Sequence, residues 1–390
     1  MSVVARDDAL LPAVRRIGIE IAARHADDVD RNARFPYEAI EALRNERALS
    51  ALVPHELGGA GAGIESVGAM CFELGRSCGA TAMVFAMHQI QVASIVRHLD
   101  DAPWFEGYLR RLADEQRLIA SATSEVGTGG DMGRSIASVV PGTDGLCSIE
   151  KQASTVSYGE QADDILVTVR RAPDAEPGDQ VALLVHKEQT SLEQTGTWDP
   201  LGMRGTCSPG FVVRAEFPEA QVLPTPFARI AAESMVPLSH ILWSHLWLGI
   251  ATDAFDRARA FVRAQARQRP GDPPPTAVRL SHLLSELSVL RAEVASGLHD
   301  FVEIADGKRR IELSTVAAAL RFNSLKIASS EQAPRICQGA MGVCGIAGYK
   351  NDTPYSVGRH LRDTMSACLM VANERIHQTN AGLLLIAKDT

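Results

Sequence analysis

The stretch "IASATSEVGTGGDMGRSIASVV" (119–140) divides this chain, because helical patterning precedes it and strand patterning follows it. Short runs rich in β-branched residues alternate with Gly, Pro and Asp turns from this point, at 137–140, 164–169, 181–185 and 210–213. This spacing predicts an antiparallel sheet or a small barrel. It lacks the helix after each strand that a parallel βαβ sheet requires.

The segment before the glycine-rich stretch has the periodicity of helices, from about residue 8 to 118. Val67, Met70, Cys71 and Leu74 fall at i, i+3, i+4 and i+7, which is one face of a helix. Pro54 and the glycines of 58–63 separate such helices.

Helical periodicity returns after about residue 228 and continues to about 385. Leu280, Leu283, Leu284 and Leu287 form one apolar stripe. The proline run in "RQRPGDPPPT" (267–276) cannot be helical, so it predicts a hairpin between two long helices. The sequence therefore predicts an α+β protein with three domains, at 1–118, 119–228 and 229–390.

Composition and charge limit the function classes. The chain has 390 residues, 46% of them hydrophobic, which suits a packed globular core. A net charge of −8 gives no electrostatic reason to expect nucleic acid or anionic membrane as a partner. No apolar run of membrane-spanning length and no signal-peptide centre is evident, so we predict a cytoplasmic protein.

Cysteine and histidine spacing argues against a metal site. The seven cysteines are scattered and none forms a CxxC pair, so they are predicted to be buried thiols. His240 and His245 are five residues apart and do not share a helix face. His88, a polar residue in an apolar helix, has two interpretations: a satisfied core histidine or a residue that lines a pocket.

The glycines of "GTGGDMG" (127–133) do not fit a dinucleotide fingerprint. Their spacing differs from G-x-G-x-x-G, and a strand follows where that fingerprint needs a helix. A loop whose backbone amides approach an anion or a flat ring system remains open.

Five ordered segments resemble the acyl-CoA dehydrogenase flavoprotein family over nearly the whole chain. They are "LVPHELGGAGAGIESVGAMCFELGRSCGATAM" (52–83), "ATSEVGTGGDMG" (122–133), "WDPLGMRGTCSPGFVV" (198–213), "QGAMG" (338–342) and "RHLRD" (359–363). The resemblance implies an N-terminal helical domain, a middle antiparallel β-barrel and a C-terminal four-helix bundle. This is the order that periodicity predicts.

The resemblance also implies a bound FAD and positions for it. Thr123 and Ser124 would face the flavin ring, with the Ser124 hydroxyl near N5. Gly130 stands where the family usually has a serine. Ala153 and Thr155 match the strand that covers one ring face, and Ala153 lacks the indole common there, which leaves that face more open.

Three further positions would reach a flavin held by a neighbouring copy of the chain. Arg267 matches an arginine at the pyrophosphate, and Gly339 and Ala340 match the glycine pair at the adenosine half. Pro270 replaces the phenylalanine expected before Gly271. Sites shared between copies imply a homo-oligomer, usually a dimer of dimers.

The family's chemistry requires a base that takes the α-proton of an acyl thioester while flavin N5 accepts the β-hydrogen as hydride. Counting from Arg362, the usual glutamate position is Val371, and the alternative position on an earlier helix is Ser239, followed by His240. Neither position holds a carboxylate. Glu374 lies three residues later, which on a helix rotates a side chain by about 300° and shifts it by roughly 4.5 Å. It is the candidate base.

Three functions remain open on this reading. The first is FAD-dependent α,β-dehydrogenation of an acyl-CoA or acyl-carrier-protein thioester, with Glu374 as base, His88, Ser239, His240 and Val371 lining the substrate pocket, and an electron-transfer flavoprotein as acceptor. The second is a flavin monooxygenase or oxidase supplied by a flavin reductase, which needs no α-proton base. The third is a non-catalytic partner subunit of a mixed oligomer.

Overall fold

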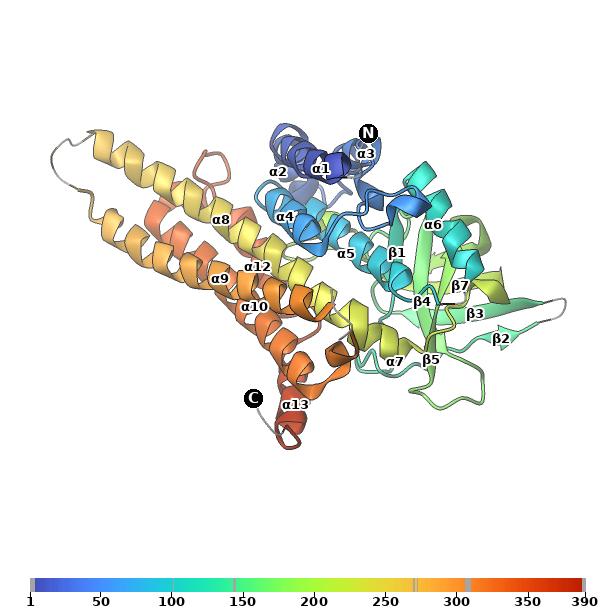
Figure 1. Ribbon diagram of the computed structural model, residues 1–390. Coiled ribbons are helices and arrows are strands. Elements are labelled where there is room, and N and C mark those ends of the chain that lie inside the picture. The colour runs from blue at the N-terminus through green and yellow to red at the C-terminus, as the bar shows by residue number, and fades with distance from the viewer. Residues whose placement is uncertain are drawn as a thin grey trace.

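The computed structural model describes residues 4–100, 102–142, 145–268, 271, 273–305 and 310–387 (Figure 1). Helices make up the first region, and their sequence positions are α1 (Val4–Ile17), α2 (Ala23–Arg31), α3 (Tyr37–Asn45), α4 (Ile64–Gly75), α5 (Gly79–Val96) and α6 (Pro103–Glu115). The stripe predicted on α4 is confirmed, because Val67, Met70, Cys71 and Leu74 are all completely buried.

Helix α5 passes through the centre of the fold. This helix of 18 residues is long and apolar enough to cross a membrane, whereas the sequence analysis expected no such segment. However, 89% of the helix is buried inside the protein. A helix that is covered by protein on all sides has apolar residues around its whole circumference. The burial accounts for the composition of α5.

The middle region consists of two sheets. The strands are β1 (Ile119–Ala122), β2 (Val140–Pro141), β3 (Leu146–Ala153), β4 (Asp164–Arg170), β5 (Gln180–His186), β6 (Thr190–Gln194) and β7 (Phe211–Pro218). One sheet has the order β1-β4-β5 and the other β2-β3-β7-β6.

One strand pair differs from the predicted antiparallel arrangement. β1 pairs with β4 in parallel, with Ile119 opposite Asp164. Helix α6 of the N-terminal region directly precedes β1 in the chain. No hairpin connects β1 to β4, so no tight turn requires the two strands to be antiparallel. The remaining strand pairs are antiparallel, as predicted.

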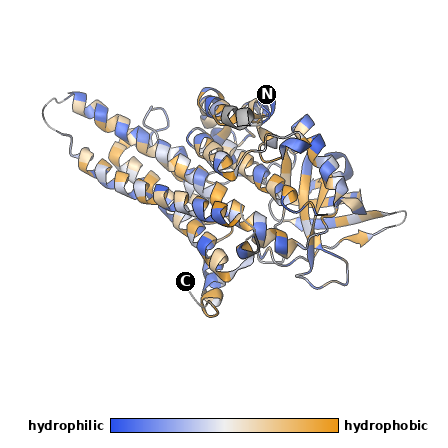
Figure 2. Cartoon of the chain, viewed as in Figure 1, coloured by the Kyte–Doolittle hydropathy of each residue, from blue (hydrophilic) through white to orange (hydrophobic). Residues whose placement is uncertain are grey.

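The last region is again helical, and hydrophilic and hydrophobic residues alternate along its long helices (Figure 2). Its helices are α7 (Phe227–Ile230), α8 (Val236–Gln268), α9 (Thr276–Ala305), α10 (Val316–Cys344), α11 (Ile346–Tyr349), α12 (Gly358–Met365) and α13 (Asn373–Leu384). The hairpin predicted at 267–276 is confirmed by the end of α8 and the start of α9, whereas Pro270 lies outside the described residues.

The predicted stripe on α9 is correct in part, since Leu283 and Leu287 are buried and Leu284 is 48% exposed. Five of the seven cysteines are buried, as predicted, and all seven are free thiols. The domain boundaries at 118 and 228 stay predictions.

Candidate functional site

The glycine-rich loop between β1 and β2 lies beside the end of β3. Ser124 Oγ donates a hydrogen bond to the carbonyl oxygen of Thr155 (2.9 Å) and lies 3.3 Å from Thr155 Oγ1. The Thr155 amide donates to Ser124 Oγ (3.2 Å). Ser124 and Thr155, which the sequence predicts for one site, are therefore adjacent. Thr123 directly precedes Ser124, and both of these residues are half-buried.

Ala153 lies at the end of β3. Side chains along β3 alternate between the two sides of the sheet, and Ala153 falls on the buried side with 1% of its surface exposed. Its neighbour Thr155 is exposed. The hydroxyl of Thr155 is thus the accessible group of this strand end.

Glu125 anchors the loop from beneath, which the sequence analysis missed. Its carboxylate accepts hydrogen bonds from the Ala137 amide (2.7 Å) and from Ser135 Oγ (2.6 Å). The Lys151 ammonium lies 3.5 Å away, and burial lowers the pKa of Lys151 to about 8. The signal for this role in the sequence was the position of the acidic Glu125 next to the glycines of 127–133.

Three loop glycines adopt a backbone that other residues rarely take. Gly127, Gly129 and Gly130 have φ angles of 92°, 63° and 79°. Glu125 fixes the base of the loop, while these glycines leave its outer backbone exposed. Such a loop can present amides to an anion or a ring edge.

The turn between α12 and α13 reaches this loop from the C-terminal region. The Arg375 guanidinium, on the first turn of α13, donates a hydrogen bond to the carbonyl oxygen of Gly129. Glu374 precedes it and is exposed. The structure thus brings residues 374–375 next to 129–130, although 246 positions separate Gly129 from Arg375 in the sequence.

A buried lysine fixes the same turn from the other side. Lys326 Nζ on α10 donates to the carbonyl oxygen of Val371 (3.0 Å) and to Asn373 Oδ1 (2.6 Å). Burial lowers the pKa of Lys326 to about 8. Val371 has a φ of 45°, so the turn has a conformation unusual for a β-branched residue.

Ser239 and His240 lie near the start of α8. Ser239 Oγ donates to the Met235 carbonyl oxygen (2.6 Å). His240 Nδ1 donates to the carbonyl oxygen of Phe322 (3.1 Å). Burial, with the Lys326 charge as a second cause, lowers the pKa of His240 to about 3, so its imidazole is neutral.

His88 has the contacts of a core histidine, one of the two interpretations that the sequence left open. Its Nδ1 accepts from the Ile119 amide (3.0 Å), so the proton is on Nε2, which donates to the Leu49 carbonyl oxygen (2.7 Å). The side chain is completely buried, and burial lowers its pKa to about 4. In this structure both ring nitrogens are used by backbone groups and none is left for a substrate.

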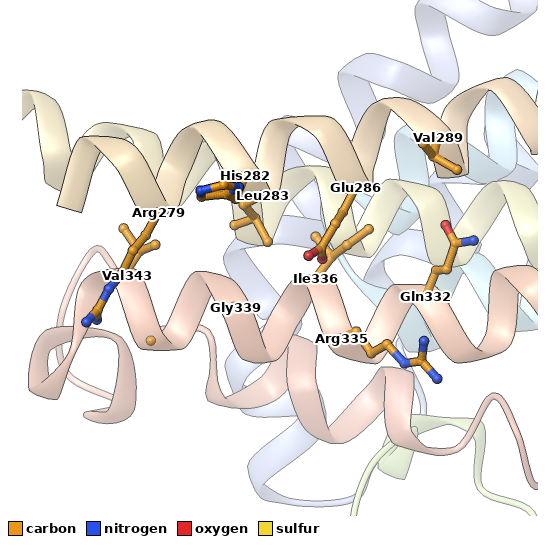
Figure 3. A pocket seen from close by; sticks show the side chains of 11 residues that line it. Arg279, His282, Leu283, Glu286, Val289, Gln332, Arg335, Ile336, Gly339 and Val343 are labelled. Carbon is orange, nitrogen blue, oxygen red and sulfur yellow. The ribbon is translucent and has the colours of Figure 1, made fainter.

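Arg267 and Gly339 lie on two of the long helices, α8 and α10. Arg267 and Ser239 are 28 positions apart on α8, which corresponds to roughly 42 Å along the helix. Gly339 lines a groove of about 660 Å³ between α9 and α10 (Figure 3). The next residue, Ala340, is completely buried.

The groove combines apolar side chains with charges of both signs. Leu283 and Ile336 line it together with Arg279, His282, Arg335 and the acidic Glu286 (Figure 3). In the described part of the chain, no cluster of three or more His, Cys, Asp or Glu side chains could hold a metal ion.

The Arg-Asp pair of "RHLRD" joins the three regions. Arg362 Nη1 donates to Asp30 Oδ1 of the N-terminal region (2.9 Å). Asp363 Oδ1 accepts from the Met203 amide of the middle region (2.7 Å), and burial raises the pKa of Asp363 to about 6. These contacts are structural, and they fix where the following turn begins.

Comparison with known proteins gives relatives with more than one activity. The chain is 25% identical to cyclohex-1-ene-1-carbonyl-CoA dehydrogenase of Syntrophus aciditrophicus, and the match covers 97% of this chain and 89% of the relative. It is 27% identical to a probable FMNH2-dependent monooxygenase, SfnC, of Pseudomonas putida, and the match covers 64% of this chain and 62% of the relative. The fold is similar to FMN-bound TdsC from Paenibacillus sp. A11-2, with a TM-score of 0.80, 19% identity and coverage of 98% and 97% of the two chains.

Two family models match the helical regions. The acyl-CoA dehydrogenase N-terminal domain matches residues 5–116, and the acyl-CoA dehydrogenase C-terminal domain matches residues 232–370. Together they cover more than half of the chain, on either side of the strand region that carries the glycine-rich loop. The chain therefore belongs to the acyl-CoA dehydrogenase family.

Proposed function

We propose that this chain is a flavin-dependent monooxygenase on the acyl-CoA dehydrogenase scaffold. Its substrate would lie between the glycine-rich loop and the turn at 371–375. The observation that carries this proposal is that Glu374 is exposed, while the two positions that the family resemblance assigns to the α-proton base, Val371 and Ser239, hold no carboxylate. A monooxygenase does not need that base.

The contacts of the turn support Val371, and not Glu374, as the residue in the base position. A shift that brought Glu374 inward would break both hydrogen bonds of Lys326 and leave its charge buried. Hydrogen bonds to charged groups are worth about 1.5–3 kcal/mol each, and an unpaired buried charge costs more. Movement of Glu374 into the site is therefore unfavourable.

The residues present fit a flavin at the loop. Ser124 and Thr155 offer hydroxyl groups at an accessible edge, and the positive-φ glycines expose backbone amides. A reduced flavin bound there would supply two electrons to O2, so that one oxygen atom enters the substrate and the other leaves as water. His240 is uncharged and would bind a polar substrate group by a hydrogen bond, without adding charge.

The relatives support a flavin but not one form of it. The SfnC relative is described as FMNH2-dependent, and the TdsC structure contains FMN. FMN is therefore a second candidate beside the FAD that the family resemblance implies. A flavin reductase would be the partner of a monooxygenase, in the cytoplasm.

An anaerobic titration tests the proposal. The purified protein would be loaded with flavin and mixed with a panel of acyl-CoAs in the absence of oxygen. We expect the visible absorbance of the oxidised flavin to persist, and we expect oxygen uptake above that of a flavin reductase alone when reduced flavin is supplied. Bleaching by any acyl-CoA would overturn the monooxygenase assignment.

Acyl-thioester dehydrogenation is the second candidate. It is favoured by the position of Glu374 directly before Arg375, whose guanidinium contacts the loop, and by the similarity to a cyclohex-1-ene-1-carbonyl-CoA dehydrogenase. Its electron acceptor would be an electron-transfer flavoprotein. A chain that purifies without flavin but gains activity with a second polypeptide would instead be a partner subunit.

A homo-oligomer, a dimer of dimers, is proposed for either activity. Arg267 lies roughly 42 Å along α8 from Ser239, which is proposed to line the substrate pocket, so Arg267 and the groove beside Gly339 would serve the flavin of a neighbouring copy. Exposed apolar residues on α9, namely Val278, Leu284 and Val289, offer a surface for such a copy.

A further inference from the structure

Three ring side chains follow one another along a single face of α8. His240, Trp243 and Trp247 are spaced at i, i+3 and i+7, and all three are buried. The ring centroids of His240 and Trp243 lie 6.4 Å apart, and those of Trp243 and Trp247 lie 6.3 Å apart. We call these three neighbouring side chains the α8 ring row.

His240 gives this row a hydrogen-bond acceptor that is not used by the protein. Its Nδ1 faces the carbonyl oxygen of Phe322, which can only accept, so Nδ1 carries the proton. Burial and the Lys326 charge lower the pKa of His240, so the imidazole is neutral and Nε2 has a free lone pair. Within the described residues no N–H or O–H group donates to Nε2.

The two indoles offer the opposite polarity. Trp243 Nε1 and Trp247 Nε1 are buried, and neither has a hydrogen-bond partner in the part of the chain that the structure describes. An indole N–H can only donate, and buried polar groups in folded proteins are rarely left without a partner. Two unpaired donors beside an unpaired acceptor therefore indicate a polar ligand.

The row begins beside the proposed substrate site. Phe322, the partner of His240 on α10, lies one helical turn before Lys326. The hydrogen bonds of Lys326 hold the turn at 371–373, which forms one side of that site. A substrate group that reaches past this turn would meet His240 first and then Trp243.

A neutral hydroxyl group is the chemistry that fits an acceptor beside a donor. It can donate to His240 Nε2 while its oxygen accepts from Trp243 Nε1, whereas a carboxylate would face the lone pair of Nε2 and an ammonium would face the indole N–H. We propose that His240 and Trp243 bind a hydroxyl group of the substrate, which is an uncharged alcohol or phenol. This inference rests on the proposed function and names the substrate class of the same site.

Three small aromatic probes test the assignment without turnover. Phenol carries the hydroxyl, toluene has a methyl group in its place, and benzoate carries a carboxylate. Each would be titrated by calorimetry into the flavin-loaded, oxidised protein. We expect phenol to bind at least roughly 10-fold more tightly than toluene or benzoate, because only phenol pairs both ring nitrogens. Equal affinities for phenol and toluene would overturn the proposal.

Two substitutions test the acceptor and the donor separately. His240→Phe removes the acceptor, and Trp243→Phe removes the N–H group but keeps an aromatic ring. Each should weaken phenol by roughly 10-fold and leave toluene within about twofold, and His240→Gln should restore part of the phenol affinity. If circular dichroism shows that His240→Phe does not fold, unchanged phenol binding by Trp243→Phe alone refutes the proposal.

His245 provides a matched control on the same helix. It is also buried, but its Nδ1 bonds the Ile241 carbonyl oxygen of its own helix, and its ring lies against Gly68 of α4. His245→Gln should leave both affinities within about twofold of the wild type. An equal loss of phenol affinity here would mean that packing along α8, and not a contact with His240, is responsible, and would count against the proposal.

The outcomes separate this inference from the proposed function. If oxygen uptake is as expected but phenol has no advantage over toluene, the ring row binds water only, and the substrate assignment fails while the monooxygenase assignment stands. If an acyl-CoA bleaches the flavin, the proposed function fails, whereas a preference for phenol that depends on His240 would still support the hydroxyl contact.

Discussion

Lys326 is a completely buried cation whose two hydrogen bonds both go to the turn that precedes α13. Burial lowers its pKa from 10.5 to about 8 in the folded chain. Between these values the unfolded chain binds more protons, so the free energy of unfolding should rise with pH. Below about pH 8 the lysine is charged in both states and the cost of burying that charge is fully present.

We expect Lys326→Met to reduce this rise. Urea unfolding at pH 7.5 and 9.5 should give a pH-dependent increase that is smaller in the variant by about 1–2 kcal/mol, since each pKa unit corresponds to about 1.4 kcal/mol. Lys151, whose pKa is also about 8, remains in both proteins and retains its own contribution. Equal slopes in the two proteins would show that Lys326 is not a buried charge.

His88 should make the fold sensitive to acid. Its folded pKa of about 4 lies below the ordinary value of 6.5, so stability is complete above pH 6.5 and falls as the pH approaches 4. Asp363, whose pKa is raised to about 6, acts in the opposite direction below pH 6.

We expect His88→Ala to destabilise the protein by about 2–4 kcal/mol at pH 7, because a cavity forms and the Ile119 amide loses its acceptor. The variant should also lose less stability between pH 6.5 and 5 than the wild type. The exposed His377 provides a control, and His377→Ala should change neither quantity. Thermal melts over this pH range would measure both effects.

The segment from α12 to α13 carries Val371 and Glu374, on which the choice between the two proposed reactions depends. Because Glu374 is exposed on the first turn of α13, we expect Glu374→Gln to leave flavin binding and oxygen uptake with a reductase within about twofold of the wild type. The same variant would abolish acyl-CoA-driven flavin reduction if the chain is a dehydrogenase. Stopped-flow absorbance with and without oxygen distinguishes the two results.

Local sequence patterns predicted the elements that local interactions determine. The stripe on α4 and the hairpin between α8 and α9 follow from apolar spacing and from proline, so they could be read directly. The parallel pairing of β1 with β4 depends on residues about 45 positions apart, and no turn signal records it.

Candidate-site residues were predictable only where a segment resembles a known motif. Ser124 and Thr155 were identified in that way, and the structure brings them together. Lys326 and Arg375 were missed, because their roles depend on contacts with segments far along the chain. A lone basic residue in a helix carries no signal of such a contact.

The assembled protein should depend on the exposed apolar face of α9. Val289 is 59% exposed there, and Val289→Glu would place a charge where another copy is proposed to pack. We expect a smaller oligomer by size-exclusion chromatography with light scattering, and weaker flavin retention. Ile19, 58% exposed on the N-terminal region, is the matched control, and Ile19→Glu should leave the size unchanged.

The length of α8 has a consequence for how the protein behaves when it is dilute. Because this single helix separates Ser239 from Arg267 by roughly 42 Å, the flavin contact proposed for Arg267 would come from a second chain. Specific activity should then fall on dilution into the nanomolar range, and added flavin should slow that decline by linking binding to association.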